Sequence, residues 1–113
     1  MDQSIRKLSE YAHQLRFEDI SEEAVHECKR RLIDTLGCAI VAFDAEPSRI
    51  ARAVARRYTG DPPARVFGTL QASSPEHAAF ANGVMLRYQD YNDSYFMKSS
   101  GHPSDTLAAV LPF

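Results

Sequence analysis

The chain has 113 residues, of which 44% are hydrophobic and 25% are charged. This composition is typical of one small globular domain and excludes disordered and collagen-like chains. The formal net charge is −2 and the basic residues are spread along the chain, which argues against a partner that is nucleic acid or an anionic membrane.

The two cysteines and the start of the chain indicate the compartment. Cys28 and Cys38 are ten residues apart in one predicted helix, and the rise of about 15 Å between them is too long for a disulfide. Free thiols are typical of a reducing compartment. The chain opens on a polar amphipathic stretch with no signal-like apolar core, and the longest apolar run, residues 38–43, is too short to span a bilayer. We therefore expect a cytoplasmic protein.

The first predicted element is a short amphipathic helix. Ile5, Leu8, Ala12 and Leu15 recur at helical spacing, so one face is apolar. Ser4 is a candidate N-cap because its hydroxyl can accept from a free backbone N–H. We interpret the segment as a packing helix.

The second predicted helix is the longest. Ser21 followed by two glutamates is a strong helix start, and apolar residues mark one face through about six turns, to Phe43. Residues 36–42 are apolar nearly all round, which predicts burial on several sides, with Gly37 permitting close contact with another helix.

The third predicted helix begins at Pro47 and stops at Gly60, because proline favours the first helical position and glycine the position after the last. Its arginines are expected to form a solvated face. They are Arg49, Arg52, Arg56 and Arg57.

A connector and a fourth helix follow. Residues 65–67 predict a short strand or an extended connector. Ser74 before Pro75 predicts a helix start, and residues 78–86 are small and apolar, which predicts tight packing. The fold class expected from these patterns is all-α, with four to five helices and little or no strand.

The character of the chain changes at Asp90. Residues 90–95 are polar, although they directly follow an apolar helix, and Gly101-His102-Pro103 then precedes a second apolar run. Pro103 reads as the first residue of a helix, which places His102 at the positive end of a helix dipole. That end favours the neutral imidazole that a general base or a hydrogen-bond donor requires. The alternative interpretation is a capped, solvated loop.

Two motifs carry a resemblance to a known family. Residues 82–94 (NGVMLRYQDYNDS) and 101–105 (GHPSD), supported by 31–38 and 78–83, resemble the MmgE/PrpD family of 2-methylcitrate dehydratases and cis-aconitate decarboxylases. The resemblance covers nearly all of the chain from about Ser21 onward.

Members of that family are several times longer, with a large helical domain and a second α/β lid domain. The resemblance thus implies that residues 1–113 are part of the N-terminal helical domain. It also implies that the remainder of that domain, the lid and the family's substrate-binding lysines lie beyond Phe113. We expect the full-length protein to be a homodimer.

The resemblance assigns roles to individual residues. Asp90 and His102 match active-site residues of the family, and Ser94 stands where the family has Thr or Ser. A polycarboxylate substrate also needs cations, for which Lys98 and Arg87 are the local candidates. Beside the catalytic pair, the residues expected to bind substrate are Asn92, Asp93, Ser94 and Lys98.

The chemistry that the resemblance implies is elimination of water from a small hydroxy-polycarboxylate such as 2-methylcitrate, without a metal or other cofactor. The chain's histidines and cysteines do not follow metal-ligand spacing. Elimination needs a base and an acid, and Asp90 and His102 are the candidate pair, with the assignment open. Two alternatives remain: a family isomerase or decarboxylase for another di- or tricarboxylate, and a non-catalytic helical interaction module or truncated gene product.

Overall fold

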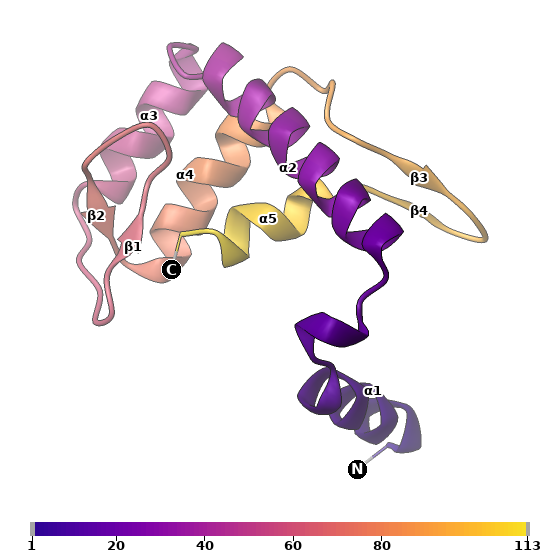
Figure 1. Cartoon of the computed structure of the whole chain (residues 1–113). Helices are drawn as coiled ribbons and strands as arrows, with labels where there is room; N and C mark the ends of the chain where they lie inside the picture. The colour runs from indigo at the N-terminus through magenta and orange to yellow at the C-terminus, as the bar shows by residue number, and fades with distance from the viewer. Residues whose placement is uncertain (1, 113) are drawn as a thin grey trace.

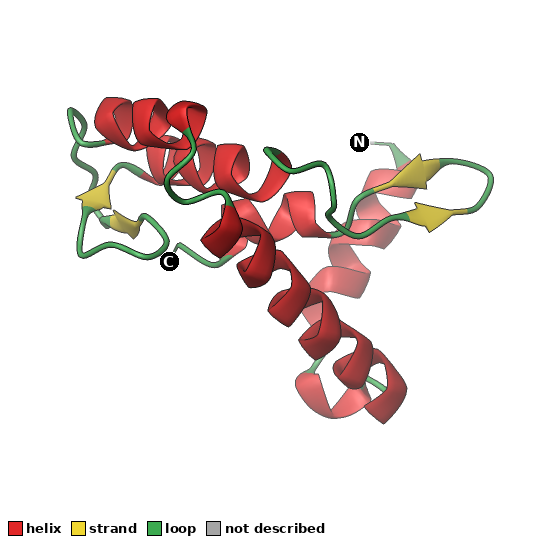
Figure 2. Ribbon diagram, turned by 90° about the horizontal axis from the view of Figure 1, so that it is seen from above, coloured by secondary structure: helices red, strands yellow, loops and turns green. Residues whose placement is uncertain are grey.

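The computed structural model describes residues 2–112 and contains five α-helices in that range. In chain order they are α1 (Gln3–Gln14), α2 (Glu22–Val41), α3 (Glu46–Ala55), α4 (Pro75–Arg87) and α5 (Ser104–Val110), with a 3-10 turn, η1 (Phe17–Asp19), before α2. The all-α prediction is confirmed (Figures 1 and 2). None of the helices within residues 2–112 is both long and apolar enough to cross a membrane.

Extended structure is confined to two small antiparallel pairs. Strand β1 (Ala64–Arg65) pairs with β2 (Ala72–Ser73), and β3 (Tyr95–Phe96) pairs with β4 (Ser100–Gly101). In Figure 1 the β3–β4 hairpin projects from the helices beside α2. The expected extended segment at 65–67 is therefore a strand that ends at Arg65.

Helix α4 is the centre of the packed body. It packs against α2, α3 and α5 (Figure 1), and its small side chains let these helices approach closely. Asn82 on α4 is fully buried, where its Oδ1 accepts from the Phe67 N–H at 2.8 Å and its Nδ2 donates to the Arg65 carbonyl at 3.1 Å. The amide thus ties the end of β1 to α4. The buried apolar core consists of Ala39, Ala51, Ala55, Ala64, Val66, Ala78, Ala81, Met85, Leu86 and Ala108.

The helix starts follow the local signals, with one change. The Ser21 hydroxyl accepts from the Ala24 N–H at 3.2 Å, so the predicted cap of α2 is confirmed. Helix α4 starts at Pro75, as expected. The cap of α1 is Asp2, whose carboxylate accepts from the Ser4 N–H at 2.7 Å. The prediction that Ser4 is the cap was therefore wrong, because a carboxylate two residues earlier reaches the free N–H first.

Helix α3 is shorter than expected. It ends at Ala55 rather than at Gly60, with Arg56 as its C-cap. Arg52 does not join the solvated face: its guanidinium donates to the Phe43 carbonyl at 2.6 Å and stacks 3.8 Å from the Phe43 ring centroid. The cation–π contact and the hydrogen bond hold the α2–α3 corner closed.

The apolar end of α2 is largely exposed within residues 2–112. Thr35, Cys38, Ala39 and Ala42 are buried, but Ile40 is 74% exposed. A Cβ added at Gly37 would meet nothing within 4 Å. The predictions of burial on several sides and of a close contact at Gly37 were therefore wrong for this chain, because the other helices cover only one face of α2.

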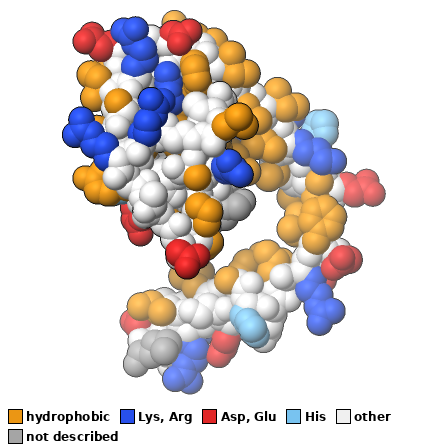
Figure 3. All heavy atoms as spheres, turned by 90° about the vertical axis from the view of Figure 1, so that its left-hand side faces the viewer, with side chains coloured by type: hydrophobic (Ala, Val, Ile, Leu, Met, Phe, Trp, Pro, Cys, Tyr) orange, Lys and Arg blue, Asp and Glu red, His pale blue; other side chains and the backbone are white. Residues whose placement is uncertain are grey.

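Helix α1 lies apart from the packed body. All of its residues are exposed, and Figure 1 shows it as an arm below the body, joined to α2 through η1. Figure 3 shows apolar side chains on the side of this arm that faces the body, across an open gap. Within residues 2–112, α1 therefore does not pack against the other helices, in contrast to its interpretation as a packing helix.

Candidate functional site

The candidate site is built on the segment that joins α4 to α5. Asp90 ends the α4 region with a left-handed backbone, φ 55°, which Asp tolerates better than most residues. Its carboxylate is 83% exposed and lies 3.6 Å from the Arg87 guanidinium. The turn therefore directs the Asp90 carboxylate away from the core and into solvent.

Asn92 joins the end of α4 to the start of α5. It is buried, its Oδ1 accepts from Arg87 Nη1 at 3.0 Å, and its Nδ2 donates to the Ser104 hydroxyl at 3.0 Å. Buried amides must be paired in this way to offset their loss of water. These bonds give Asn92 a positioning role.

Asp93 is held from two directions. Its Oδ2 lies 2.6 Å from Arg31 Nη1 on α2, and its Oδ1 accepts from the backbone N–H of Ser104 at 3.0 Å. Burial alone raises the pKa of Asp93, but the hydrogen bonds from Ser104 and Arg31 outweigh it and hold this pKa below its ordinary value. Asp93 is therefore an anchored carboxylate, and its two oxygens already have partners within the chain.

His102 contacts the same segment from the α5 side. Its Nδ1 lies 2.7 Å from the Asp93 carbonyl oxygen and 3.3 Å from the Ser94 hydroxyl. A carbonyl oxygen can only accept, so Nδ1 carries the proton, and in the neutral ring Nε2 holds a lone pair. The Ser94 hydroxyl consequently does not donate to His102 and keeps its proton for another acceptor.

The helix behind His102 begins close to the expected place. Pro103 has helical backbone angles as the N-cap, and α5 runs from Ser104 with Asp105 in its first turn. The backbone N–H of Asp105 donates to the His102 carbonyl at 3.1 Å. The turn thus fixes the backbone of His102 directly before the helix.

Lys98 lies apart from these contacts. It is exposed in the turn between β3 and β4, where the Met97 N–H donates to the Ser99 carbonyl at 3.0 Å. Arg87, the other candidate cation, contacts Asn92, Asp90 and Asp105. Arg87 is thus held by neighbouring side chains, whereas Lys98 is exposed to solvent.

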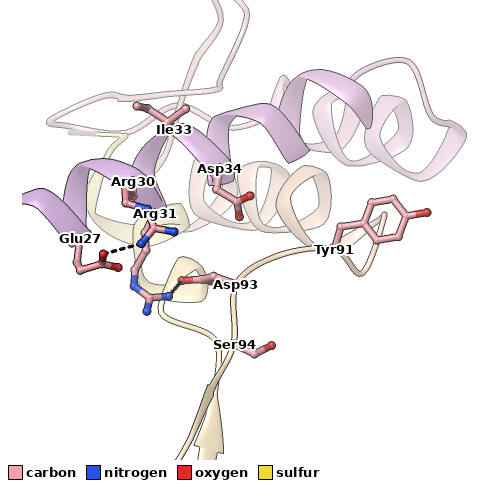
Figure 4. A pocket seen from close by; sticks show the side chains of 8 residues that line it. All are labelled: Glu27, Arg30, Arg31, Ile33, Asp34, Tyr91, Asp93 and Ser94. Carbon is pink, nitrogen blue, oxygen red and sulfur yellow. Dashed lines mark hydrogen bonds and ion pairs between the residues drawn. The ribbon is translucent and has the colours of Figure 1, made fainter.

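An open hollow of ≈ 610 Å³ lies between α2 and the polar segment. Figure 4 shows Arg31 reaching from α2 to Asp93 across it, with Ser94 below and the Glu27–Arg30 pair on the helix. The residues that line it are Glu27, Arg30, Arg31, Ile33, Asp34, Tyr91, Asp93 and Ser94.

The structure thus brings Asp93, Ser94 and His102 together. Asp90 belongs to the same segment but pairs with Arg87 instead, and Lys98 is on the hairpin turn. The roles of all these residues in binding or catalysis stay predictions.

Sequence reasoning missed Arg31 as part of this cluster. It lies 62 positions before Asp93, and no local spacing rule connects the two. The available signal was the resemblance of residues 31–38 to a family segment, which gave no role for the arginine.

The class of this chain is an α-helical domain with a polar turn between two of its helices. The model of the MmgE/PrpD N-terminal domain matches residues 6–113. The chain belongs to the MmgE/PrpD family.

Its relatives include dehydratases from bacteria and fungi. It is 36% identical over 97 residues to the 2-methylcitrate dehydratase of Cupriavidus necator, covering 85% of this chain and 20% of the relative. It is 28% identical over 111 residues to the probable 2-methylcitrate dehydratase of Saccharomyces cerevisiae, covering 97% of this chain and 21% of the relative. The alkylcitrate dehydratase phiI of a fungal species is 32% identical over 112 residues, with 97% and 22% covered. The chain spans about a fifth of the length of these curated relatives.

Proposed function

We propose that this chain supplies part of the active site of a dehydratase that removes water from a 2-methylcitrate-like hydroxy-polycarboxylate. The relatives that are 2-methylcitrate dehydratases support the reaction class. The observation that carries the proposal is His102, whose Nδ1–H is held by the Asp93 carbonyl so that Nε2 is free to accept a proton, beside the hydroxyl of Ser94.

The reaction breaks a C–H bond and a C–O bond, and it forms a C=C bond, a bond from the proton to the base and an O–H bond of the departing water. A base removes the proton from the carbon next to a carboxylate, the electron pair of that C–H bond forms the C=C bond, and the hydroxyl on the neighbouring carbon leaves as water after an acid protonates it. In the first assignment, His102 Nε2 accepts the proton. The Asp93 carbonyl then stabilises the resulting imidazolium, because it accepts from Nδ1 in both protonation states.

Asp90 is the second group of the proposed pair. In the first assignment Asp90 is the acid that donates a proton to the departing hydroxyl. In the reverse assignment its carboxylate is the base and His102 is the acid. Its exposed carboxylate is open to a substrate. We expect Asp90 and His102 to face one pocket in the full-length protein. A separation of more than about 12 Å between the two groups in a full-length structure would contradict a shared site, since one small substrate could not hydrogen-bond to both.

The remaining predicted residues divide by their contacts. Ser94 and Lys98 are available to bind the substrate's carboxylates or hydroxyl, whereas Asn92 and Asp93 make bonds within the chain that hold the segment in place. No metal or cofactor enters this proposal. We also propose that the full-length protein is a cytoplasmic homodimer.

His102→Gln in the full-length protein tests the proposal. Gln keeps much of the size but cannot take up the proton, so turnover of 2-methylcitrate is expected to fall by about 100-fold or more. The measurement is kcat/KM as a function of pH, in which the variant should lose one limb of the profile. Wild-type turnover with an unchanged profile would make His102 a structural cap and place the chemistry elsewhere.

The alternative of a non-catalytic interaction module also has an observation in its favour. Large apolar side chains are exposed on α1 and α2, including Leu8 at 67% and Ile40 at 74%. This alternative applies to the 113-residue chain by itself. Dehydratase activity of that chain would refute it.

A further inference from the structure

One charged side chain reaches the polar segment from a distant helix. Arg31 comes from the middle of α2 and contacts the Asp93 carboxylate with its Nη1 at 2.6 Å (Figure 4). The Asp93 side chain is 9% exposed and that of Arg31 is 33% exposed. The pair is therefore largely screened from water, which strengthens a charged hydrogen bond.

Asp93 uses both its side chain and its backbone. The carboxylate is fixed between Arg31 and the N–H of Ser104, while the carbonyl of the same residue accepts from His102 Nδ1 at 2.7 Å. Residues 91–94 are neither helix nor strand, so no regular backbone ladder fixes the direction of this carbonyl. Besides the contact with His102, the contacts nearest to this carbonyl are the two hydrogen bonds of the Asp93 side chain.

We propose that Arg31 is a positioning residue: through the Asp93 carboxylate it holds the Asp93 carbonyl against His102 Nδ1 and so keeps His102 Nε2 unprotonated and free to accept. The two protonated forms of a neutral imidazole differ only in which nitrogen bears hydrogen, so a hydrogen bond to one nitrogen selects between them. As far as turnover is concerned, this inference rests on the proposed function. The choice of protonated nitrogen does not, and it can be measured without substrate.

The experiment is nitrogen NMR of the chain with isotope-labelled histidine, in the solid state so that self-association does not interfere. The chemical shifts of Nδ1 and Nε2 report which nitrogen is protonated. His13, His26 and His77 serve as internal references. The spectra are recorded at a pH at which the imidazoles are neutral. In the wild-type chain, His102 is then expected to be protonated mainly at Nδ1. A wild-type His102 protonated mainly at Nε2 would overturn the proposal directly.

Three variants test the role of Arg31. Arg31→Gln removes the charge that holds Asp93, and the ratio of Nε2-protonated to Nδ1-protonated His102 should rise about threefold to tenfold, the scale of losing one hydrogen bond. Arg31→Lys keeps a donor of the same charge and should restore most of the wild-type ratio. Arg30→Gln is the matched control, because Arg30 neighbours Arg31 but pairs with Glu27 at 2.6 Å, and it should leave the ratio unchanged.

Folding is monitored by circular dichroism and by the spectra of the other histidines. A folded Arg31→Gln chain with the wild-type ratio would overturn the proposal. If Arg31→Gln does not fold, Asp93→Asn decides, because it removes the charge that Arg31 holds but keeps the carbonyl that contacts His102. A raised ratio in a folded Asp93→Asn chain supports the proposal, and the wild-type ratio contradicts it.

Turnover of the full-length protein separates this inference from the proposed function. Arg31→Gln should lower kcat about tenfold while KM changes little, because it misaligns a group and removes no contact to substrate. If the protonation ratio shifts as expected but His102→Gln retains full turnover, then the proposed function fails and the positioning role of Arg31 stands. If His102→Gln abolishes turnover and the ratio does not respond to Arg31, the reverse holds.

Discussion

Asp90 combines a special backbone with a proposed chemical role, and the two must be separated by the choice of substitution. Its φ of 55° is readily adopted by Asn and Gly but costs other residues about 1–2 kcal/mol. Asn at this position thus keeps the turn and the shape of the side chain, and removes the charge and the titratable proton.

We predict that Asp90→Asn in the full-length protein lowers kcat/KM by about 100-fold or more at nearly unchanged stability. Asp90→Ala should show the same kinetic loss together with a loss of about 1 kcal/mol from the strained turn. Steady-state kinetics and urea unfolding check the two effects. Near-wild-type turnover of Asp90→Asn would show that Asp90 serves only to end the helix.

The lowered pKa of Asp93 makes the stability of the folded chain depend on pH. Because its pKa in the folded chain is lowered, the folded state favours the ionised form. The resulting stabilisation is fully present above the ordinary value, 3.8, and is lost as the pH falls through the lower folded value.

The Asp93→Asn chain should therefore lose about 1.5–3 kcal/mol at neutral pH, the scale of hydrogen bonds to a charged group. The difference from wild type should shrink as the pH falls below 3.8. Urea unfolding at several pH values measures both, with Asp61→Asn in an exposed turn as the control. A difference that stays constant down to the acid range would mean that the Asp93 charge does not stabilise the fold.

At the scale of elements, local signals were enough where the partner lies a few residues away. The Ser21 cap and the Pro75 start of α4 are set by atoms within one helical turn, so the sequence predicts them well. The polar segment before His102 was found for the same reason. The ion pair of Arg31 with Asp93 was not, because it depends on how α2 crosses the body.

Burial was the least predictable property of the elements. An apolar periodicity says which face of a helix avoids water, but not which other element covers it. In α2 the prediction failed at Ile40, since α4 and α5 pack against a different face of α2, which includes the buried Ala39.

The β3–β4 hairpin connects Ser94 to His102 and depends on Gly101. Tyr95 is paired with Gly101 across the hairpin, and a Cβ added at Gly101 would lie 2.8 Å from the Tyr95 ring. The absent side chain at Gly101 thus leaves room for the ring to lie over the backbone.

We predict that Gly101→Ala displaces the Tyr95 ring and destabilises the chain by about 1 kcal/mol. In a Tyr95→Ala background the same substitution should cost much less, as a double-mutant cycle would show. Gly37→Ala is the contrasting control: the added Cβ meets nothing within 4 Å, and Ala should stabilise α2 by about 0.5–1 kcal/mol. Equal effects of the two glycine substitutions on the urea midpoint would contradict this account of the hairpin.

At the scale of the whole molecule, the chain is more extended than a closed domain. Its radius of gyration is 15.9 Å, compared with about 13 Å for a compact domain of the same length. The difference reflects the α1 arm, which stands apart from the body (Figure 1). Because the curated relatives are about five times as long, we propose that their additional residues cover the apolar faces that this chain leaves open.

The 113-residue chain alone should therefore be prone to associate, because large exposed apolar patches are association sites. Residues 107–111 are one apolar stretch of this kind. Val110 there is 55% exposed, whereas Phe113 lies outside the described residues. The stripe on α2 adds Ile33 at 73% and Ile40 at 74% exposed. We also expect this chain to be catalytically inactive.

Light scattering after size exclusion should show species larger than the monomer, and an environment-sensitive dye should bind. Replacing Ile33 and Ile40 by Lys together should reduce both signals, since charged residues cannot be buried unpaired in a contact between copies. His26→Lys adds one lysine at an exposed polar position of α2 and should leave both signals unchanged. A monodisperse wild-type monomer that does not bind the dye would show that the α2 stripe is tolerated in water.

Turnover of 2-methylcitrate by the 113-residue chain would show that residues 1–113 contain a complete site, because an incomplete set of substrate-binding cations could not hold the polycarboxylate for elimination.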